Sequence, residues 1–432
     1  MDMRQKNVRQ AGAPAPKQIT AAVIGNALEW YDFVVYGFFA SVLAQAFFPS
    51  RDDTASLLLA LATFGAGFCT RPLGALFFGF YADRKGRKAA LQLVMFAMTA
   101  AVAVIALTPT YAKIGVSAPL LIVAGRLLQG FATGGEYSSS TCFLIEMAPR
   151  GRRGFYGSLQ VFGQALSILL ATLAGIIVTS VFSVDAVNEW AWRLPFFAGL
   201  LIGPVGLYVR RQLDETPAFK ATARACGARE AFVDLIRRRG ERLLVCFVAT
   251  IGTTISFYVI LVYMPTYAKT EMGLTLEQSF LAQAPALLLL MALTPLMGVF
   301  SDVVGRRPLL LASNGLLLLC AYPLYVWLQA ERSVLALALA QIAFCVMMSG
   351  ICGAFSTALA EQFPTHMRSA GLAIPYNLAV MIFGGFAPFI VAWLIGFFDT
   401  PVAPAFYLIF GAGAGLLGVA GLHERHRESD LE

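Results

Sequence analysis

Four polar side chains inside the first apolar segment carry the most specific chemical information in this sequence. Within GNALEWYDFVVYG they are Asn26, Glu29, Asp32 and Tyr36, at spacings of three, three and four residues. That spacing places them along one face of a helix, with Trp30 on another face. A charged side chain facing lipid at the centre of a bilayer costs at least about 2.5–3.5 kcal/mol. The polar face is therefore expected to look into the interior of a helix bundle.

Two interpretations of this face are open. It could be a hydrogen-bond network that holds the first helix to its neighbours, or it could handle a proton or a substrate. The functional interpretation is favoured because carboxylates within membranes usually serve transport or proton transfer. Asp32, near the centre of the segment, is the first choice for a proton carrier, and Glu29 could do this or pair with a basic gate residue. Glu136, directly after Thr-Gly-Gly, is the third candidate.

Two arginines also lie inside apolar segments, Arg71 and Arg126. A guanidinium stays charged in proteins and offers a planar fork that matches a carboxylate. Arg71 is expected either to pair with Glu29 or Asp32 or to bind an anionic substrate. Glu136 lies ten residues from Arg126, about 15 Å along a helix, so Arg126 needs another partner, for which a substrate is a candidate.

Neutral polar side chains complete the predicted site. In the first half of the chain the candidates for substrate binding are Asn26, Tyr36, Gln129, Gln160 and Gln164, although the glutamines could equally join helices. The second half carries no charge away from the ends of its apolar segments. It is therefore expected to contribute aromatic walls and neutral hydrogen bonds, with Tyr263 and Asn377 as the candidates.

The composition identifies the environment of these residues. Of the 432 residues, 58% are hydrophobic and 13% are charged, and the mean hydropathy is +0.71. Soluble domains carry about 25% charged residues, so this is an integral membrane protein. The net charge of +7 does not indicate nucleic-acid binding, because the basic residues fall in short loops between apolar runs. The cysteine and histidine spacing predicts neither a disulfide framework nor a metal site, and no cofactor is expected.

Twelve membrane helices account for the apolar runs, with both ends of the chain on the inner side. Of the 32 Lys and Arg residues, 25 fall in the predicted inner segments and 5 in the outer ones. The predicted domains are an inner tail (1–19), a six-helix bundle (20–210), an inner linker (211–241), a second six-helix bundle (242–421) and a tail (422–432). The predicted helices are 20–47, 55–81, 88–109, 119–147, 155–182, 192–210, 242–267, 275–300, 307–328, 333–362, 369–397 and 402–421.

Two motifs occur once in each half. The first, Gly-x3-Asp-x2-Gly-Arg-Lys/Arg, starts at Gly79 and again at Gly298, and the second, Glu-x2-Pro-x3-Arg, starts at Glu146 and again at Glu361. Both pairs fall in equivalent inner loops, which predicts two six-helix bundles in parallel repeat. That architecture is typical of alternating-access carriers, whose substrate site lies between the halves near the middle of the bilayer.

The sequence resembles the metabolite:proton symporter family of the major facilitator superfamily, which includes citrate, α-ketoglutarate, shikimate and proline/betaine transporters. The resemblance spans nearly the whole chain. It is carried by GNALEWYDFVVYG (25–37), RPLGALFFGFYADRKGRK (71–88), GRLLQGFATGGEY (125–137), EWAWRLPF (189–196), RRQLDETPAF (210–219), SDVVGRRP (301–308) and EQFPTHMRSAGL (361–372).

The resemblance implies a gate at the cytoplasmic face and a bacterial-type inner membrane location. Its charged residues would form pairs that hold the inner side closed and break in each cycle; a simple positive-inside anchor is the alternative. The gate residues implied are Asp83, Arg84, Arg87, Glu146, Arg153, Asp302, Arg306, Glu361 and Arg368. A monomer is expected from the resemblance alone.

The sequence as a whole predicts a secondary active transporter rather than an enzyme. It would import a small organic acid, such as a di- or tricarboxylate, together with protons. A zwitterionic osmolyte such as proline or betaine, or a shikimate-type acid, is the alternative substrate. No P-loop motif occurs, so ATP is not expected to drive the transport.

Overall fold

The computed structural model describes residues 16–85, 87–149, 151–200 and 228–425, and every regular element within them is a helix. Residues 211–227 of the predicted linker 211–241 lie outside the described residues.

The first half of the chain forms a bundle of long helices and short connecting helices. Its last described helical segment covers residues 193–200. The other elements are α2 (Pro16–Phe38), α3 (Ala40–Phe47), α4 (Asp53–Cys69), α5 (Arg71–Lys85), α6 (Arg87–Leu107), α7 (Tyr111–Ile114), α8 (Ser117–Ala132), α9 (Glu136–Glu146), α10 (Arg153–Val181), α11 (Val184–Ala186) and the π-helix η1 (Val187–Ala191).

The second half repeats this arrangement, and its helices α16, α17 and α18 are each 26 to 29 residues long. Thr275 and Gln278 form a capping box that fixes the start of α16, because each side chain satisfies a backbone N–H of the other residue. The elements are α14 (Ala228–Phe257), the π-helix η2 (Tyr258–Tyr263), α15 (Met264–Glu271), α16 (Leu276–Val304), α17 (Arg306–Glu331), α18 (Val334–Ala360), the 3₁₀-helix η3 (Thr365–Met367), α19 (Arg368–Ala379), the π-helix η4 (Val380–Gly384), α20 (Ala387–Phe398) and α21 (Ala403–Gly421).

Several predicted spans are single helices interrupted near the middle. The span predicted at 20–47 consists of α2 and α3, which meet at an angle of 64°. The spans predicted at 242–267 and 369–397 contain η2 and η4, where the chain forms a π-helical segment between two α-helices. Such segments are frequent at functional sites, because they change the direction in which side chains point.

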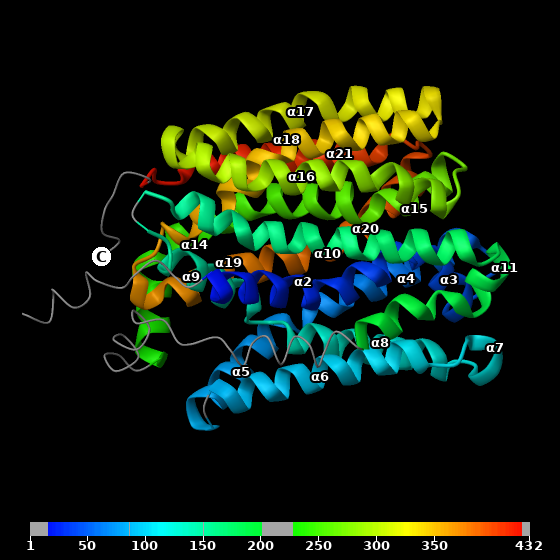
Figure 1. The fold of residues 1–432 in the computed structure, drawn as a ribbon, viewed down its shortest axis with the longest axis horizontal. Helices are drawn as coiled ribbons and strands as arrows, with labels where there is room; N and C mark the ends of the chain where they lie inside the picture. The colour runs from blue at the N-terminus through cyan, green and yellow to red at the C-terminus, as the bar shows by residue number, and fades with distance from the viewer. Residues whose placement is uncertain (1–15, 86, 150, 201–227, 426–432) are drawn as a thin grey trace, which may run out of the picture.

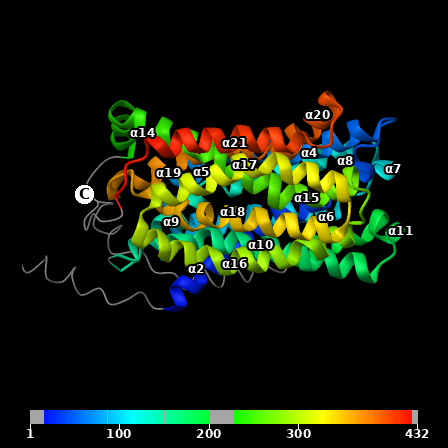
Figure 2. The same cartoon turned by 90° about the horizontal axis from the view of Figure 1, so that it is seen from above.

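The two halves lie side by side along their full length (Figures 1 and 2). α10 of the first half packs along α16 and α18 of the second half, and α4 packs against η4 and α20. α14 packs against α19 and α21 within the second half, and α6 packs against α8 within the first. The interface between the two halves therefore lies in the interior of the molecule.

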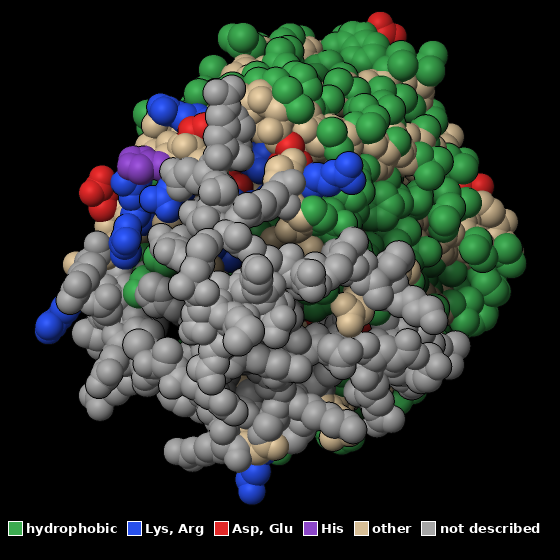
Figure 3. Space-filling view, turned by 60° about the vertical axis from the view of Figure 1, so that its left-hand side comes forward, with side chains coloured by type: hydrophobic (Ala, Val, Ile, Leu, Met, Phe, Trp, Pro, Cys, Tyr) green, Lys and Arg blue, Asp and Glu red, His purple; other side chains and the backbone are tan. Residues whose placement is uncertain are grey.

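The outer surface is apolar around the helices. Eight helical spans among the described residues are long and apolar enough to cross a membrane, and the bent α2–α3 pair makes a ninth. Hydrophobic side chains cover the flank in Figure 3, and charged side chains gather at the end where α9 ends and α14 begins. This distribution fits a bundle embedded in a bilayer with its charged loops at one face.

Candidate substrate and proton site

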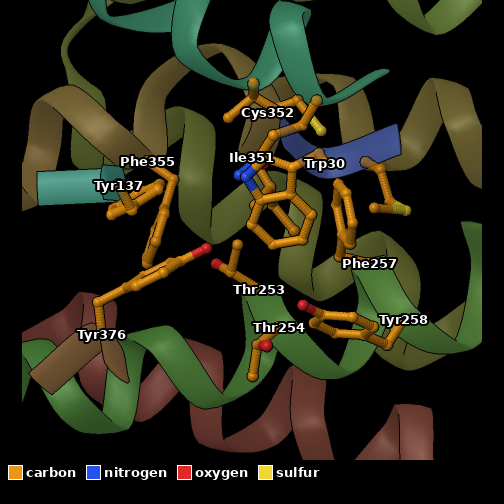
Figure 4. A pocket seen from close by; sticks show the side chains of 13 residues that line it. Trp30, Tyr137, Thr253, Thr254, Phe257, Tyr258, Ile351, Cys352, Phe355 and Tyr376 are labelled. Carbon is orange, nitrogen blue, oxygen red and sulfur yellow. The ribbon is translucent and has the colours of Figure 1, made fainter. Parts of the chain in front are cut away.

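A small cavity lies between the two halves (Figure 4). Its volume is ≈ 30 Å³, which is room for about two water molecules. An organic substrate therefore needs these walls to move apart. The lining residues come from both halves: Trp30, Tyr137, Val161, Gln164, Thr253, Thr254, Phe257, Tyr258, Met348, Ile351, Cys352, Phe355 and Tyr376.

Aromatic rings make most of the wall of this cavity. Tyr137 of the first half and Tyr376 of the second stack in parallel, with their ring centroids 3.5 Å apart. The Tyr137 hydroxyl also lies 3.0 Å from Ser356 Oγ on α18. On the other side Trp30 meets Phe257 edge to face, with their centroids 6.1 Å apart. The rings from the two halves thus touch each other around the cavity.

Arg71 lies beside this cavity and has no hydrogen bond or ion pair to any described residue. Its side chain is 3% exposed. Its guanidinium carbon lies 5.1 Å from the centre of the Trp30 ring and 4.7 Å from that of Phe68. The charge of Arg71 also acts on the hydroxyls of Tyr258 and Tyr376. A buried cation with aromatic neighbours and no anionic partner is available to bind an anion.

A close helix contact holds Arg71 at this position. Arg71 is the first residue of α5, and its carbonyl oxygen packs directly on Gly134, in the break between α8 and α9. A Cβ atom at Gly134 would lie only 2.1 Å from that oxygen. The small residues in the Thr-Gly-Gly stretch thus let the two helices approach closely enough to bring Arg71 to the cavity.

Arg126 is bound within the protein instead. Its Nη1 donates to Gln129 Oε1 at 2.6 Å and its Nη2 donates to the carbonyl of Phe64 at 3.2 Å. Its guanidinium carbon lies 4.6 Å from the centre of the Tyr36 ring and 4.7 Å from that of Phe33. Arg126 is fully buried and is not among the residues that line the cavity. In this conformation the contacts of Arg126 are structural. Gln129 and Tyr36, which were predicted to bind substrate, instead contact Arg126.

Asp32 lies close to this cationic cluster. Its carboxylate is 5% exposed, and its Oδ1 has no hydrogen-bond partner among the described residues. The charges of Asp32 and Arg126 act on each other. Gly199 packs against the carboxylate so tightly that a Cβ atom there would lie 1.9 Å from Oδ1. Glu29 is also buried, at 6% exposure, whereas Glu136 at the start of α9 is only partly buried.

Asn26 and Gln160 bind each other across two helices. Asn26 Nδ2 donates to the Gln160 carbonyl at 2.8 Å, and Gln160 Nε2 donates to Asn26 Oδ1 at 3.3 Å. Ser140 Oγ donates to Gln160 Oε1 at 2.6 Å. These contacts join α2, α9 and α10. Of the glutamines predicted to bind substrate, Gln164 alone lines the cavity.

The second half contributes other residues than those predicted. Tyr263 is buried in η2 and is not among the lining residues, and Asn377 Nδ2 donates to the Gly134 carbonyl at 3.0 Å. The walls come instead from Tyr258 and Tyr376. Trp30 also lines the cavity, although the sequence places it on a different face of its helix from Asp32. No sequence pattern marks the π-helix that starts at Tyr258, so the sequence alone could not place Tyr258 in the cavity wall.

At the charged end of the molecule, ion pairs and hydrogen bonds join the two halves. Within the second half, Arg306 Nη2 lies 2.7 Å from Asp302 Oδ1 and 3.3 Å from Glu361 Oε1, which ties together the gate ends of α16, α17 and α18. Arg368 of the second half lies 3.5 Å from Glu146 of the first. All five residues belong to the predicted gate, and the Arg368–Glu146 pair joins the two halves in this conformation.

Asp302 has a second role at the same gate. Its two carboxylate oxygens accept from the backbone N–H groups of Gly154 at 2.8 Å and Phe155 at 3.1 Å. A residue of the second half thereby caps the N-terminus of α10 in the first half, where the helix dipole favours a negative charge. Thr357 Oγ1 also donates to the Arg153 carbonyl at 3.1 Å. The side chains of Asp83, Arg84 and Arg87 lie outside what the structure describes.

The opposite end of the bundle is closed as well. Lys269 Nζ on α15 donates to Ser41 Oγ on α3 at 3.2 Å, and Ser180 Oγ on α10 donates to Glu277 Oε1 on α16 at 2.8 Å. Both contacts join one half to the other. Contacts between the halves thus lie on both sides of the cavity.

Two six-helix halves around a buried polar site, closed at each end by contacts that can break, define a membrane carrier. The sequence profile described as Major Facilitator Superfamily matches residues 22–374. The chain belongs to this superfamily of transporters, and the all-α, twelve-helix fold predicted from the sequence is confirmed.

Similar proteins differ in what their names say they carry. The chain is 34% identical over 411 residues to a proline/betaine transporter of Salmonella typhimurium, covering 93% of this chain and 82% of the relative. It is 35% identical over 415 residues to a citrate-proton symporter of Klebsiella pneumoniae, covering 96% and 93%. The structure is similar to that of the proton:xylose symporter XylE bound to 6-bromo-6-deoxy-D-glucose, with a TM-score of 0.77, 18% identity and coverage of 95% and 96%.

Proposed function

We propose that this protein is a proton-coupled symporter that moves a small organic anion across a bacterial inner membrane. The observation that carries this proposal is Arg71, a cation 3% exposed beside the central cavity, without an anionic partner among the described residues. A buried charge is costly unless it is paired, so the site is set up to receive a carboxylate.

Aromatic contacts keep Arg71 available for that role. The three rings around its guanidinium belong to Trp30, Phe33 and Phe68, with centroids at 5.1, 5.2 and 4.7 Å. Each such contact contributes up to about 2 kcal/mol when desolvated, yet none uses a guanidinium N–H. The guanidinium donates no hydrogen bond to any described residue, so its fork can form a bidentate bond to a carboxylate, which is shorter and stronger than a neutral hydrogen bond.

Proton coupling follows from the charges around Arg71. Asp32 partly offsets the charge of Arg126, and the charges of Arg71 and Arg126 oppose each other. When Asp32 takes up a proton, the cluster gains one net positive charge and attracts an anion more strongly. Anion binding in turn stabilises the cluster with Asp32 protonated. The two events therefore favour each other, which is the linkage a symporter needs. Glu29 and Glu136 are the alternative carriers of the proton.

Alternating access would use the contacts at the two ends of the bundle. The Arg368–Glu146 ion pair and the cap of α10 by Asp302 hold one end closed, and Arg306 keeps Asp302 in place from within the second half. The contact from Lys269 to Ser41 does so at the other end. Opening would break the buried Arg368–Glu146 pair and the cap of α10 at one end, and the hydrogen bond from Lys269 to Ser41 at the other.

A zwitterionic osmolyte is the second candidate substrate, and the aromatic wall favours it. Trp30, Tyr137, Phe257, Tyr258, Phe355 and Tyr376 all line the cavity. Rings in this arrangement bind quaternary ammonium groups through cation–π contacts. The carboxylate of a betaine would then bind Arg71, as in the first candidate.

Uptake into proteoliposomes with an imposed inward proton gradient tests the proposal. Labelled citrate, 2-oxoglutarate, shikimate and proline betaine are offered separately, each with and without a protonophore. We expect one of the organic acids to accumulate and the protonophore to abolish its accumulation. Accumulation of the betaine alone would favour the second candidate. Uptake that ignores the protonophore would contradict proton coupling.

A further inference from the structure

Three buried polar atoms that face the central cavity have no hydrogen-bond partner among the described residues. They are Gln164 Nε2, Thr254 Oγ1 and the Tyr258 hydroxyl. Gln164 lies near enough to the Tyr376 hydroxyl to interact with it, although not in good hydrogen-bond geometry, so the two hydroxyls are the stronger evidence. The three side chains are 4%, 3% and 3% exposed. Figure 4 shows the hydroxyl ends of Thr254 and Tyr258 turned towards the space that the rings enclose.

A buried polar group without a partner costs about 1–3 kcal/mol, so a protein keeps several of them together only where something else binds them. The local fold explains why these groups stay unpaired. Tyr258 is the first residue of the π-helix η2, and Thr254 lies one turn earlier in α14. Gly384 packs against Thr254, where a Cβ atom would lie 2.0 Å from Oγ1. Thr254 Oγ1 and the Tyr258 ring thus both lie against Gly384 of η4.

The chemistry of the three atoms defines what they bind. The amide Nε2 only donates, and both hydroxyls can donate. No Asp or Glu is among the lining residues that would accept from a substrate amine. A quaternary ammonium group has no acceptor and would leave all three donors unpaired. The complementary group is therefore an oxygen acceptor, either a carboxylate or a carbonyl.

We propose that Gln164, Thr254 and Tyr258 form a donor subsite that recognises a second oxygen-bearing group of the substrate, while Arg71 binds the first carboxylate. This inference rests on the proposed function and narrows it to acids with two acceptor groups. Gln164 comes from α10 of the first half, and Thr254 and Tyr258 come from the second half. A substrate bound to all three therefore ties the halves together.

Binding of glutarate and pentanoate to the purified full-length protein tests the subsite. The two acids share a five-carbon chain and differ in the second carboxylate. Apparent affinity is measured from the concentration dependence of thermal stabilisation at constant pH and ionic strength. We expect glutarate to bind about 10- to 100-fold more tightly than pentanoate, the range for hydrogen bonds to a charged group.

The double variant Thr254→Val/Tyr258→Phe removes both hydroxyls and keeps the shape of the side chains. We expect the ratio of the two affinities to fall to about one while pentanoate binding persists. The matched control is Thr266→Val/Tyr325→Phe, which removes two other buried hydroxyls without partners that are not among the lining residues. This control is expected to keep the ratio of the unaltered protein.

Each other outcome contradicts a specific statement. Equal affinities in the unaltered protein, or an unchanged ratio in the double variant, would overturn the subsite and leave the proposed function standing. A control variant that loses the ratio to the same extent would also overturn it, because the effect would then be structural. Binding of neither acid would overturn the subsite, because glutarate carries both acceptor groups that it is proposed to recognise. The proposed function is tested separately, by uptake of the four labelled substrates.

Discussion

The guanidinium carbon of Arg71 lies 5.1 Å from the centre of the Trp30 ring, and Trp30 forms part of the wall of the central cavity. A cation at the start of α5 is thus held next to the space between the two halves. The two residues come from different helices and are 41 positions apart in the chain. Their contact connects the charged cluster of the first half with the substrate cavity.

Replacing Arg71 by lysine is expected to weaken substrate binding selectively. Lysine keeps the charge but loses the planar fork and its stacking on the rings. The KM for a transported carboxylate should rise about 10- to 100-fold, the loss expected for one or two charge-assisted hydrogen bonds. The measurement is initial uptake against concentration, normalised to the amount of folded transporter. An unchanged KM would remove Arg71 from the site.

The variant Arg126→Lys provides a contrast to Arg71→Lys. Arg126 binds Gln129 and the Phe64 carbonyl within the protein, so its loss should lower the thermal stability of the purified transporter. The effect on KM should be smaller than for Arg71→Lys. A larger effect on KM with unaltered stability would instead assign substrate binding to Arg126 and a structural role to Arg71.

Replacing Asp32 by asparagine is expected to uncouple transport from the proton gradient. Asparagine has nearly the same shape and stays neutral, so it mimics the protonated carboxylate and cannot release a proton. Accumulation in proteoliposomes should vanish, whereas exchange of labelled for unlabelled substrate should continue. Retained accumulation would assign the proton to Glu29 or Glu136, and loss of exchange as well would indicate a structural role.

Glu361 should make closure of the charged gate depend on pH. Burial raises the pKa of this carboxyl, which lies just beyond the end of α18, while the charges of Arg306 and Arg153 act against the rise. Opening exposes Glu361 to water, so the closed gate holds the proton more tightly than the open one. The resulting stabilisation is fully present below the ordinary Glu pKa of about 4.3 and is lost as the pH rises through the raised value.

The distance between spin labels at the gate ends of α10 and α16, followed against pH, measures this effect. The closed population should fall as the pH rises through that window. Glu361→Gln stays neutral at every pH and should flatten the response. If that variant responds as the unaltered protein does, another group controls the gate.

Replacing Gly65 by alanine is expected to hinder closure of the two halves. Gly65 of α4 packs against Phe386, and a Cβ atom there would lie 2.5 Å from that ring. Overpacking of this kind costs about 1–3 kcal/mol, so exchange should slow by about 10- to 100-fold. The control is Gly413→Ala, whose nearest neighbour would be 3.8 Å away. Alanine favours helix at both positions, so equal slowing in the two variants would contradict a role for the contact.

Much of the architecture is determined by the sequence alone. The apolar runs, the excess of basic residues in alternate loops and the two duplicated motifs define a two-half helical carrier. The duplicated motifs also indicate which charged residues lie in the inner loops, whereas the pairs Arg306–Glu361 and Arg368–Glu146 are seen only in the structure. These features depend on residue type and spacing within one segment or its repeat, which a sequence displays directly.

Only the tertiary structure separated the two buried arginines. Both have the same chemistry in the sequence, yet Arg126 binds Gln129 and a carbonyl, whereas the contacts of Arg71 with described residues are with aromatic rings. The cavity wall is likewise made by residues such as Trp30 and Tyr258 from opposite halves. A side chain's partners depend on where helices distant in sequence approach each other and on local breaks such as η2, and neither is fixed by the spacing of residues along one helix.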